Sequence, residues 1–134
     1  MNGTRVAGCM MPNNMYAVSC DGRILMLLSG KEIVFDVNRL TKFDFSHVFD
    51  NVDKSVQICP TKLRLKHDSR TVVRLKPLID TGLEVWVDES FLKQFDGLKL
   101  YAYNEAKEVY IKDDYGHVVA VVMPVKVPKK EDLL

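Results

Sequence analysis

Hydrophobic and polar residues alternate most clearly in the last third of the chain, from Gly82 to Val127. Alternate positions from Leu83 to Val87 are apolar, which is the period of a strand with one buried face. Asp88 then supplies a helix N-cap, and Gly97 is placed to end a short helix. The apolar residues between them fall on one helical face: Phe91, Leu92 and Phe95.

Three further strand-like runs follow this short helix. They cover Leu98 to Ala102, Val109 to Ile111 and Val118 to Met123, and Pro124 ends the last of them. Polar turn residues separate the three runs. The pattern therefore predicts a unit of one strand, one helix and three strands, written β-α-β-β-β.

The same unit is predicted a second time, earlier in the chain. Glu84 to Asp96 aligns without gaps on Glu32 to Asp44, with apolar strand positions that match in type. Farther on, Lys62 to Leu78 and Glu108 to Val125 share the order strand, polar turn and strand, and both end on apolar-x-Pro-apolar. This internal similarity predicts a tandem repeat. The alternative is two unrelated α+β segments.

The predicted fold class is α+β in a single domain. Two tandem β-α-β-β-β repeats, at residues 31–79 and 82–127, are expected to form an antiparallel sheet with two helices on one side. The helix of the first repeat is expected from Val37 to about Phe49. A strand from Lys54 to Pro60 follows, with Pro60 at a sheet edge or a bulge.

Residues 1–30 are expected to add leading strands and a hairpin to this domain. A strand is predicted around Val6 to Met11. Farther on, Asp21-Gly22 is a strong tight-turn signal between Tyr16 to Val18 and Ile24 to Leu28.

Residues 128–134, with the sequence PKKEDLL, are expected to form a flexible tail.

Composition limits the class of protein. The chain has 134 residues, of which 47% are hydrophobic and 28% charged, which suits one globular domain with a core of its own. The net charge of +1 is not typical of a general nucleic-acid binder, so any DNA contact would be local. Cys9, Cys20 and Cys59 show no C-x-x-C spacing and are expected to be reduced thiols, as in a cytoplasmic protein. No apolar run is long enough for a membrane span, and no signal segment is expected.

No pattern of catalytic or metal-binding residues stands out. His47, His67 and His117 are scattered without partners at ligand spacing, so neither a metal nor a cofactor is expected. Asp113 and Asp114 are expected to form a turn rather than an acid/base pair. We therefore expect a protein that is not an enzyme. An enzyme for a small molecule is a further alternative, and it would need clustered polar residues.

Basic side chains alternate with apolar ones along the predicted hairpin from Thr61 to Lys76. Such a row can bind phosphate groups, although the more common role is the solvated face of a half-buried hairpin. The candidate phosphate contacts are Lys62, Arg64, Lys66, Arg70, Arg74 and Lys76.

Several of these features resemble the DNA sliding clamp family. The segment VVAVVMPVKV, at Val118 to Val127, is similar to the end of the bacterial DNA polymerase III β-subunit. AVSCDGRILML, at Ala17 to Leu27, is similar to that family's Ala-Thr-Asp-Gly-His-Arg-Leu-Ala stretch. One clamp domain also consists of two β-α-β-β-β units. The resemblance covers about Met15 to Val127 and implies a cytoplasmic, non-enzymatic processivity factor of DNA replication or repair.

The resemblance also implies a binding site. Clamps bind polymerases and repair proteins through short peptides whose large apolar side chains enter a pocket between the two motifs. Matching positions place the implied peptide-binding pocket here at Cys20, Gly22, Arg23, Leu25, Met123, Pro124 and Val125. In the family the two walls come from successive domains. The alternative is that Leu25 and Met123 are ordinary core residues.

Encirclement of duplex DNA is a separate expectation. This chain matches only one clamp domain, and the resemblance implies rings of six domains, so a ring would be a homo-oligomer of six copies. The two predicted helix regions carry acidic as well as basic residues, and loose gliding on DNA needs a mildly positive wall. The alternative is a standalone clamp-fold adaptor or decoy, of the kind expected from a phage or mobile element, that binds peptides or blocks a partner without encircling DNA. Leu133 and Leu134 suggest a further idea, in which the tail imitates a clamp-binding peptide.

Overall fold

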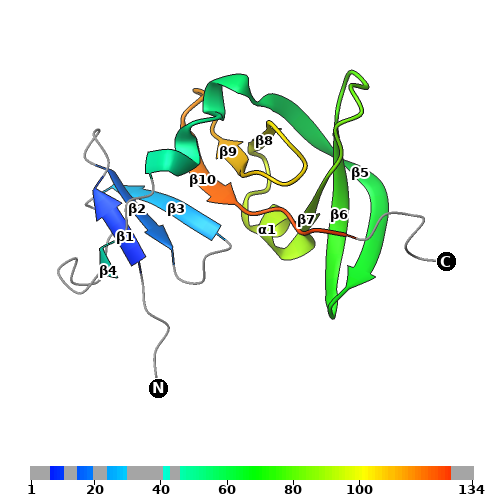
Figure 1. Cartoon of the computed structure of the whole chain (residues 1–134), viewed down its shortest axis with the longest axis horizontal. Helices are drawn as coiled ribbons and strands as arrows, with labels where there is room; N and C mark the ends of the chain where they lie inside the picture. The colour runs from blue at the N-terminus through cyan, green and yellow to red at the C-terminus, as the bar shows by residue number, and fades with distance from the viewer. Residues whose placement is uncertain (1–6, 11–14, 20–23, 30–40, 43–45, 128–134) are drawn as a thin grey trace.

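The computed structural model describes residues 7–10, 15–19, 24–29, 41–42 and 46–127. These ranges form a mostly-β domain, with a single α-helix among the described residues (Figure 1). The strands are β1 (Ala7–Met10), β2 (Met15–Ser19), β3 (Ile24–Ser29), β4 (Thr41–Lys42), β5 (Val56–His67), β6 (Arg70–Pro77), β7 (Val85–Asp88), β8 (Lys99–Ala102), β9 (Val109–Lys112) and β10 (Val118–Val122). The helices are α1 (Glu89–Gln94) and the short 3-10 helices η2 (Ser46–Phe49) and η3 (Val52–Lys54).

All described strands belong to one sheet. Its order is β4-β1-β2-β3-β10-β9-β8-β5-β6-β7. The seven strands from β3 to β7 in this order are antiparallel to their neighbours. β2 and β1 extend the antiparallel sheet beyond β3, and β4 pairs in parallel with β1. In Figure 1 the strands β1 to β3 lie on one side of the molecule and the long β5–β6 hairpin lies on the other.

The sheet curls until the segment after β10 meets β7. After β10 the chain continues to Val125, whose backbone N–H donates a hydrogen bond of 2.7 Å to the carbonyl of Trp86 in β7. This segment closes the sheet into a ring, although four other strands separate β10 from β7 in the sheet order. The ring that results encloses the main core, which takes buried side chains from all of its strands: Ile58, Leu75, Val85, Val87, Leu100, Ala102, Val109, Ile111, Ala120 and Val122.

Helix α1 packs against this core as the sequence predicts. Asp88 is the N-cap: its Oδ1 accepts hydrogen bonds from the backbone N–H of Ser90 at 2.9 Å and from the Ser90 hydroxyl at 2.8 Å. Phe91 and Phe95, one helical turn apart, are buried in the main core. Gly97 has a φ of 85°, which lets the chain turn sharply after the helix.

A second buried cluster covers the outer face of the sheet. It consists of Ala17, Leu25, Tyr110 and Val121. The segment of η2 and η3 packs over this cluster, and the Tyr110 hydroxyl donates a 2.6 Å hydrogen bond to the carbonyl of Val48. This segment is therefore held by one buried phenol as well as by apolar contact.

The helix expected from Val37 to Phe49 is wrong wherever the structure describes it. Thr41–Lys42 is strand β4, and Ser46–Phe49 is a 3-10 helix. Residues 37–40 and 43–45, like the expected strand near residues 32–36, lie outside the described residues. The region is rich in β-branched and aromatic residues, which are weak helix formers. The predicted pair of helices on one side of the sheet is thus corrected to a mostly-β fold.

The two predicted repeats differ in outcome. Residues 82–127 form β7, α1, β8, β9 and β10, which is the expected β-α-β-β-β order. In the first repeat the strand expected from Lys54 to Pro60 and the first strand of the next hairpin merge into β5. The strand does not end at Pro60 as expected. Of the two alternatives expected for Pro60, a sheet edge or a bulge, the second agrees with the shift of register between β5 and β6 from Pro60 to Arg64.

Two local predictions near the N-terminus also agree with the described residues. β1 is present, and β2 pairs antiparallel with β3 as expected for a hairpin. The Asp21-Gly22 turn and the tail at 128–134 lie outside the described residues. Cys59 is a free thiol, whereas the side chains of Cys9 and Cys20 are not described.

Candidate functional site

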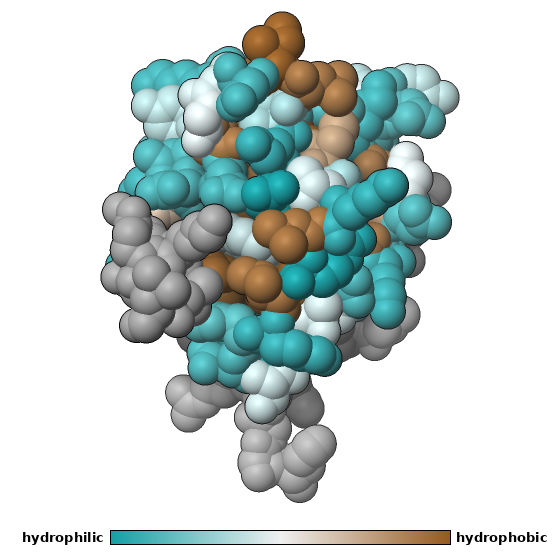
Figure 2. Space-filling view, turned by 90° about the vertical axis from the view of Figure 1, so that its right-hand side faces the viewer, coloured by the Kyte–Doolittle hydropathy of each residue, from teal (hydrophilic) through white to brown (hydrophobic). Residues whose placement is uncertain are grey.

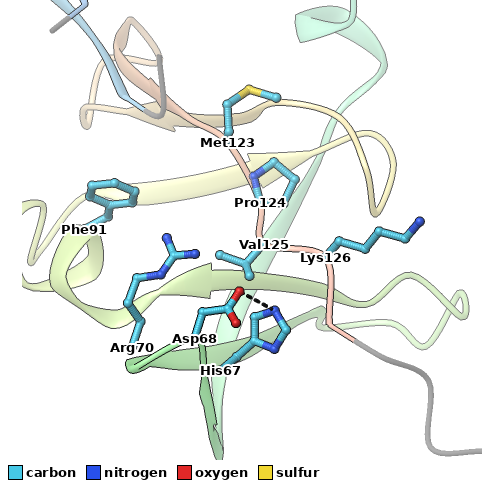
Figure 3. Close-up of a pocket in the computed structure, with 8 residues that line it drawn as sticks. All are labelled: His67, Asp68, Arg70, Phe91, Met123, Pro124, Val125 and Lys126. Atoms are coloured by element: carbon cyan, nitrogen blue, oxygen red, sulfur yellow. Dashed lines mark ion pairs between the residues drawn. The ribbon is translucent and has the colours of Figure 1, made fainter. Parts of the chain in front are cut away.

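A pocket of about 280 Å³ opens where three distant parts of the chain meet. These are the β5–β6 turn, helix α1 and the segment that follows β10 (Figure 3). The pocket is lined by His67, Asp68, Arg70, Phe91, Met123, Pro124, Val125 and Lys126. Sites for drug-sized ligands usually enclose roughly 300–1,000 Å³. This pocket therefore suits one or two side chains of a larger partner.

The segment from Met123 to Val125 forms the apolar wall of this pocket. It follows β10 directly, and the hydrogen bond from Val125 to Trp86 fixes it against β7. Met123 is 37% exposed, whereas Pro124 and Val125 are half-buried. Phe91, only 9% exposed, adds the edge of the main core to the same pocket.

Arg70 provides the main polar group. Its side chain extends into the space between Phe91 and Val125 (Figure 3). Its Nη1 lies 3.9 Å from Oδ2 of Asp88, which is an ion pair but too long for a hydrogen bond. Among the described residues no hydrogen bond to this guanidinium is present, and the side chain is 33% exposed. Arg70 therefore has N–H donors to offer to a ligand.

The remaining polar groups lie at the rim. Nε2 of His67 is 3.4 Å from Oδ2 of Asp68, an ion pair when the imidazole is protonated. Lys126 is exposed and extends away from the other lining residues (Figure 3). The lining thus holds two basic residues, Arg70 and Lys126, and the carboxylate of Asp68, with the carboxylate of Asp88 behind Arg70.

Of the residues in the implied clamp-type pocket, the structure describes Leu25 from the first motif and Met123, Pro124 and Val125 from the second. Met123, Pro124 and Val125 line the observed pocket. Leu25 is 5% exposed and belongs to the second buried cluster, where its strand pairs with β10 at Val121. Cys20, Gly22 and Arg23 lie outside the described residues.

The six basic candidates of the β5–β6 hairpin do not form one row. Directly opposed residues of paired strands share a face, and Arg64 lies opposite Val73, a fully buried residue. Arg74 lies opposite Trp86 on the other face. Because side chains alternate along each strand, Lys66 lies on the same face of the sheet as Arg64. Arg70 and Lys76 lie on the opposite face with Arg74.

Three of these cations also have carboxylate partners. The pairs are Arg64 with Glu89 at 2.9 Å, Arg74 with Glu84 at 3.3 Å and Arg70 with Asp88 at 3.9 Å. Lys62 and Lys66 are exposed, and Lys76 is half-buried. A continuous phosphate-binding strip is therefore absent from the described hairpin, and contact of single residues with phosphate stays a prediction.

Sequence reasoning missed four lining residues: His67, Asp68, Phe91 and Lys126. Phe91 was expected only as a core residue of the helix. The others have no local signal, because they reach the pocket only through the curl of the sheet and the path of the chain after Pro124.

On the face of the molecule that Figure 2 shows, apolar side chains lie in small groups surrounded by hydrophilic ones. Leu78 and Ile79, in the loop after β6, are 82% and 79% exposed. Within the described ranges, no three His, Cys, Asp or Glu side chains gather closely enough to hold a metal ion. None of the helices in those ranges is long and apolar enough to cross a membrane.

Comparison with protein-family models, with curated proteins and with solved structures finds no match to this chain. The sliding-clamp resemblance therefore rests on the sequence motifs alone. The geometry of the pocket carries the functional argument below.

Proposed function

We propose that the protein is a non-enzymatic adaptor that binds a short peptide segment of a partner protein in the pocket around Arg70. The supporting observation is an apolar wall and an available guanidinium within one small pocket. Burial of one large aliphatic side chain contributes about 1.5–3 kcal/mol, and a polar group fixes its orientation. Met123 is flexible and partly exposed, so it adapts to the shape of the side chain that enters.

Selection of a displayed library of random peptides for binding to the folded protein tests this proposal. Met123→Glu puts a carboxylate on the apolar wall at a position that already faces solvent, and we expect it to weaken selected peptides at least ten-fold. Leu78→Glu is the matched control, since Leu78 is also exposed and lies roughly 25 Å away along β6 from Arg70. Failure to select any peptide, or equal binding by both variants, would contradict the proposal.

A second proposal is the sliding-clamp role, in which several copies encircle duplex DNA as a processivity factor of replication or repair. The observation in its favour is that Met123, Pro124 and Val125, matched to the clamp C-terminal motif, line the pocket. The ion pairs of Arg64 and Arg74 leave fewer cations for a DNA-facing wall. Light scattering at several concentrations separates the two roles: a closed oligomer supports the clamp, and a monomer of 15.3 kDa leaves the adaptor.

A further inference from the structure

We infer that the pocket around Arg70 selects an acidic-aliphatic peptide, in which Arg70 binds an acidic side chain and the apolar wall receives a neighbouring Leu-like side chain. This inference rests on the proposed peptide-binding function and adds the chemistry of the peptide. Its basis is the set of N–H donors that Arg70 leaves available to a ligand and the exposed surface of the apolar wall beside them.

The guanidinium of Arg70 is only loosely held by the protein. Its partner Asp88 is 8% exposed and already accepts two hydrogen bonds from Ser90 through Oδ1. At 3.9 Å, the remaining oxygen of Asp88 orients Arg70 without using its N–H donors. A planar guanidinium with available donors matches a carboxylate, which accepts two parallel hydrogen bonds.

The acidic residue of the lining does not occupy the Arg70 guanidinium. Asp68 lies beside His67, with its Oδ2 3.4 Å from Nε2 of the imidazole, and no ion pair joins Asp68 to Arg70 among the described residues. Lys126, at the opposite rim, adds a second positive charge. An acidic side chain of a peptide can pair with Arg70 or Lys126, which a basic side chain cannot do.

The apolar wall sets the second requirement. Phe91 presents only a small exposed fraction, and Met123 is the more exposed apolar residue of the pocket. The volume of about 280 Å³ leaves room for an aliphatic side chain beside the guanidinium. Arg70 and Val125 line the same pocket, so the acidic and aliphatic residues of the peptide must be close neighbours in its sequence.

Three capped peptides separate these requirements. The first is Ac-Ser-Glu-Asp-Leu-Leu-Ser-NH₂; the second replaces its acids by Gln and Asn; the third replaces its leucines by Ser. Isothermal titration calorimetry should show binding of the first peptide, at least ten-fold weaker binding of the amide peptide, and no measurable binding of the serine peptide. Raising the salt concentration should weaken the binding of the acidic peptide and leave the binding of the amide peptide unchanged.

Substitutions in β6 assign the effect to one residue. Arg70→Gln should weaken the acidic peptide about ten-fold and leave the amide peptide unchanged, and Arg70→Lys should recover part of the loss. Lys76→Gln is the control: it removes a charge from the same face of β6, at the other end of the strand, and should change neither peptide. Circular dichroism spectra of all three variants should match the wild-type spectrum.

Two results would overturn the inference. One is equal binding of the acidic and amide peptides by the wild-type protein. The other is an equal loss on Arg70→Gln and Lys76→Gln, which would indicate a general charge effect. In both cases peptides that lose affinity on Met123→Glu would still support the proposed function, so its failure and the failure of this inference are distinguishable.

Discussion

Replacing Tyr110 by Ala is expected to lower the free energy of unfolding by about 3–5 kcal/mol, the range measured for large-to-small changes of buried aromatic residues. Tyr110 is fully buried at the centre of the second cluster. Its ring supports the 3-10 segment, and its hydroxyl holds the carbonyl of Val48. The substitution therefore removes both the packing and the hydrogen bond that fix this segment on the sheet. Urea unfolding followed by the fluorescence of Trp86 measures the loss.

A second substitution separates the contribution of the Tyr110 hydroxyl to stability from that of its ring. Tyr110→Phe keeps the packing and leaves the Val48 carbonyl without this donor, at a cost of about 1–2 kcal/mol. Tyr103→Ala is the control, because Tyr103 is 43% exposed and should change the stability by less than about 1 kcal/mol. If Tyr110→Ala cost no more than the control, the second cluster would not be a core.

Because this hydroxyl can ionise, the free energy of unfolding is expected to depend on pH in the alkaline range. Burial, with help from the carboxylate of Glu108, raises the pKa of Tyr110 above its usual value of 10.0, against a weaker opposite effect of the Asn51 backbone. The folded state thus holds this proton more tightly than the unfolded chain does. Its contribution is fully present below pH 10.0 and is lost as the pH rises through the raised pKa of the folded state. Tyr110→Phe should lack this part of the alkaline loss of stability.

Phe95→Ala is expected to cost about 3–5 kcal/mol as well. Helix α1 has six residues, too few to be stable alone, so it depends on the burial of Phe91 and Phe95. Loss of the Phe95 ring should destabilise the core and loosen the helix that lines the pocket. Denaturant unfolding measures the first effect, and hydrogen exchange of the α1 amides measures the second.

Lys93→Ala is the matched control on the same helix. Lys93 is exposed, and its pair with Glu89 at 3.7 Å is a surface interaction. Its loss should change the stability by less than about 0.5 kcal/mol. A similar cost for Lys93 and Phe95 would mean that α1 is not anchored by its buried face.

Local sequence signals predicted the structure well wherever local chemistry decides it. Alternation around Val85, the Asp88 cap and the turn at Gly97 gave the order of β7, α1 and β8 correctly. An irregularity at Pro60, either a sheet edge or a bulge, was expected for a similar reason, since proline lacks the N–H that a continuous ladder needs.

The expected first helix shows where such signals end. Its assignment depended on an apparent repeat of the second helix. The pairing of Thr41 and Lys42 with β1, more than thirty residues away in the sequence, decides the structure there instead. Contact with the sheet likewise decides the fold near Val48 and Phe49, which pack against the second cluster as part of a 3-10 helix.

The pocket was predictable only in part. Met123, Pro124 and Val125 were found through a motif that ends the last strand. Arg70 was named for phosphate binding, and the structure places it beside this segment instead. No local pattern reports that residues near 68, 91 and 124 meet, because their contact depends on the curl of the whole sheet.

The central claim is that the pocket around Arg70 binds a short peptide. The most direct test is a ¹H–¹⁵N NMR titration of the full chain with the Glu-Asp-Leu-Leu peptide described above. We expect the largest shift changes at the amides of His67 to Arg70, at Phe91 and at Met123, Val125 and Lys126, with Leu78 and Ile79 unchanged. Shift changes centred elsewhere, or none at millimolar peptide, would contradict the account.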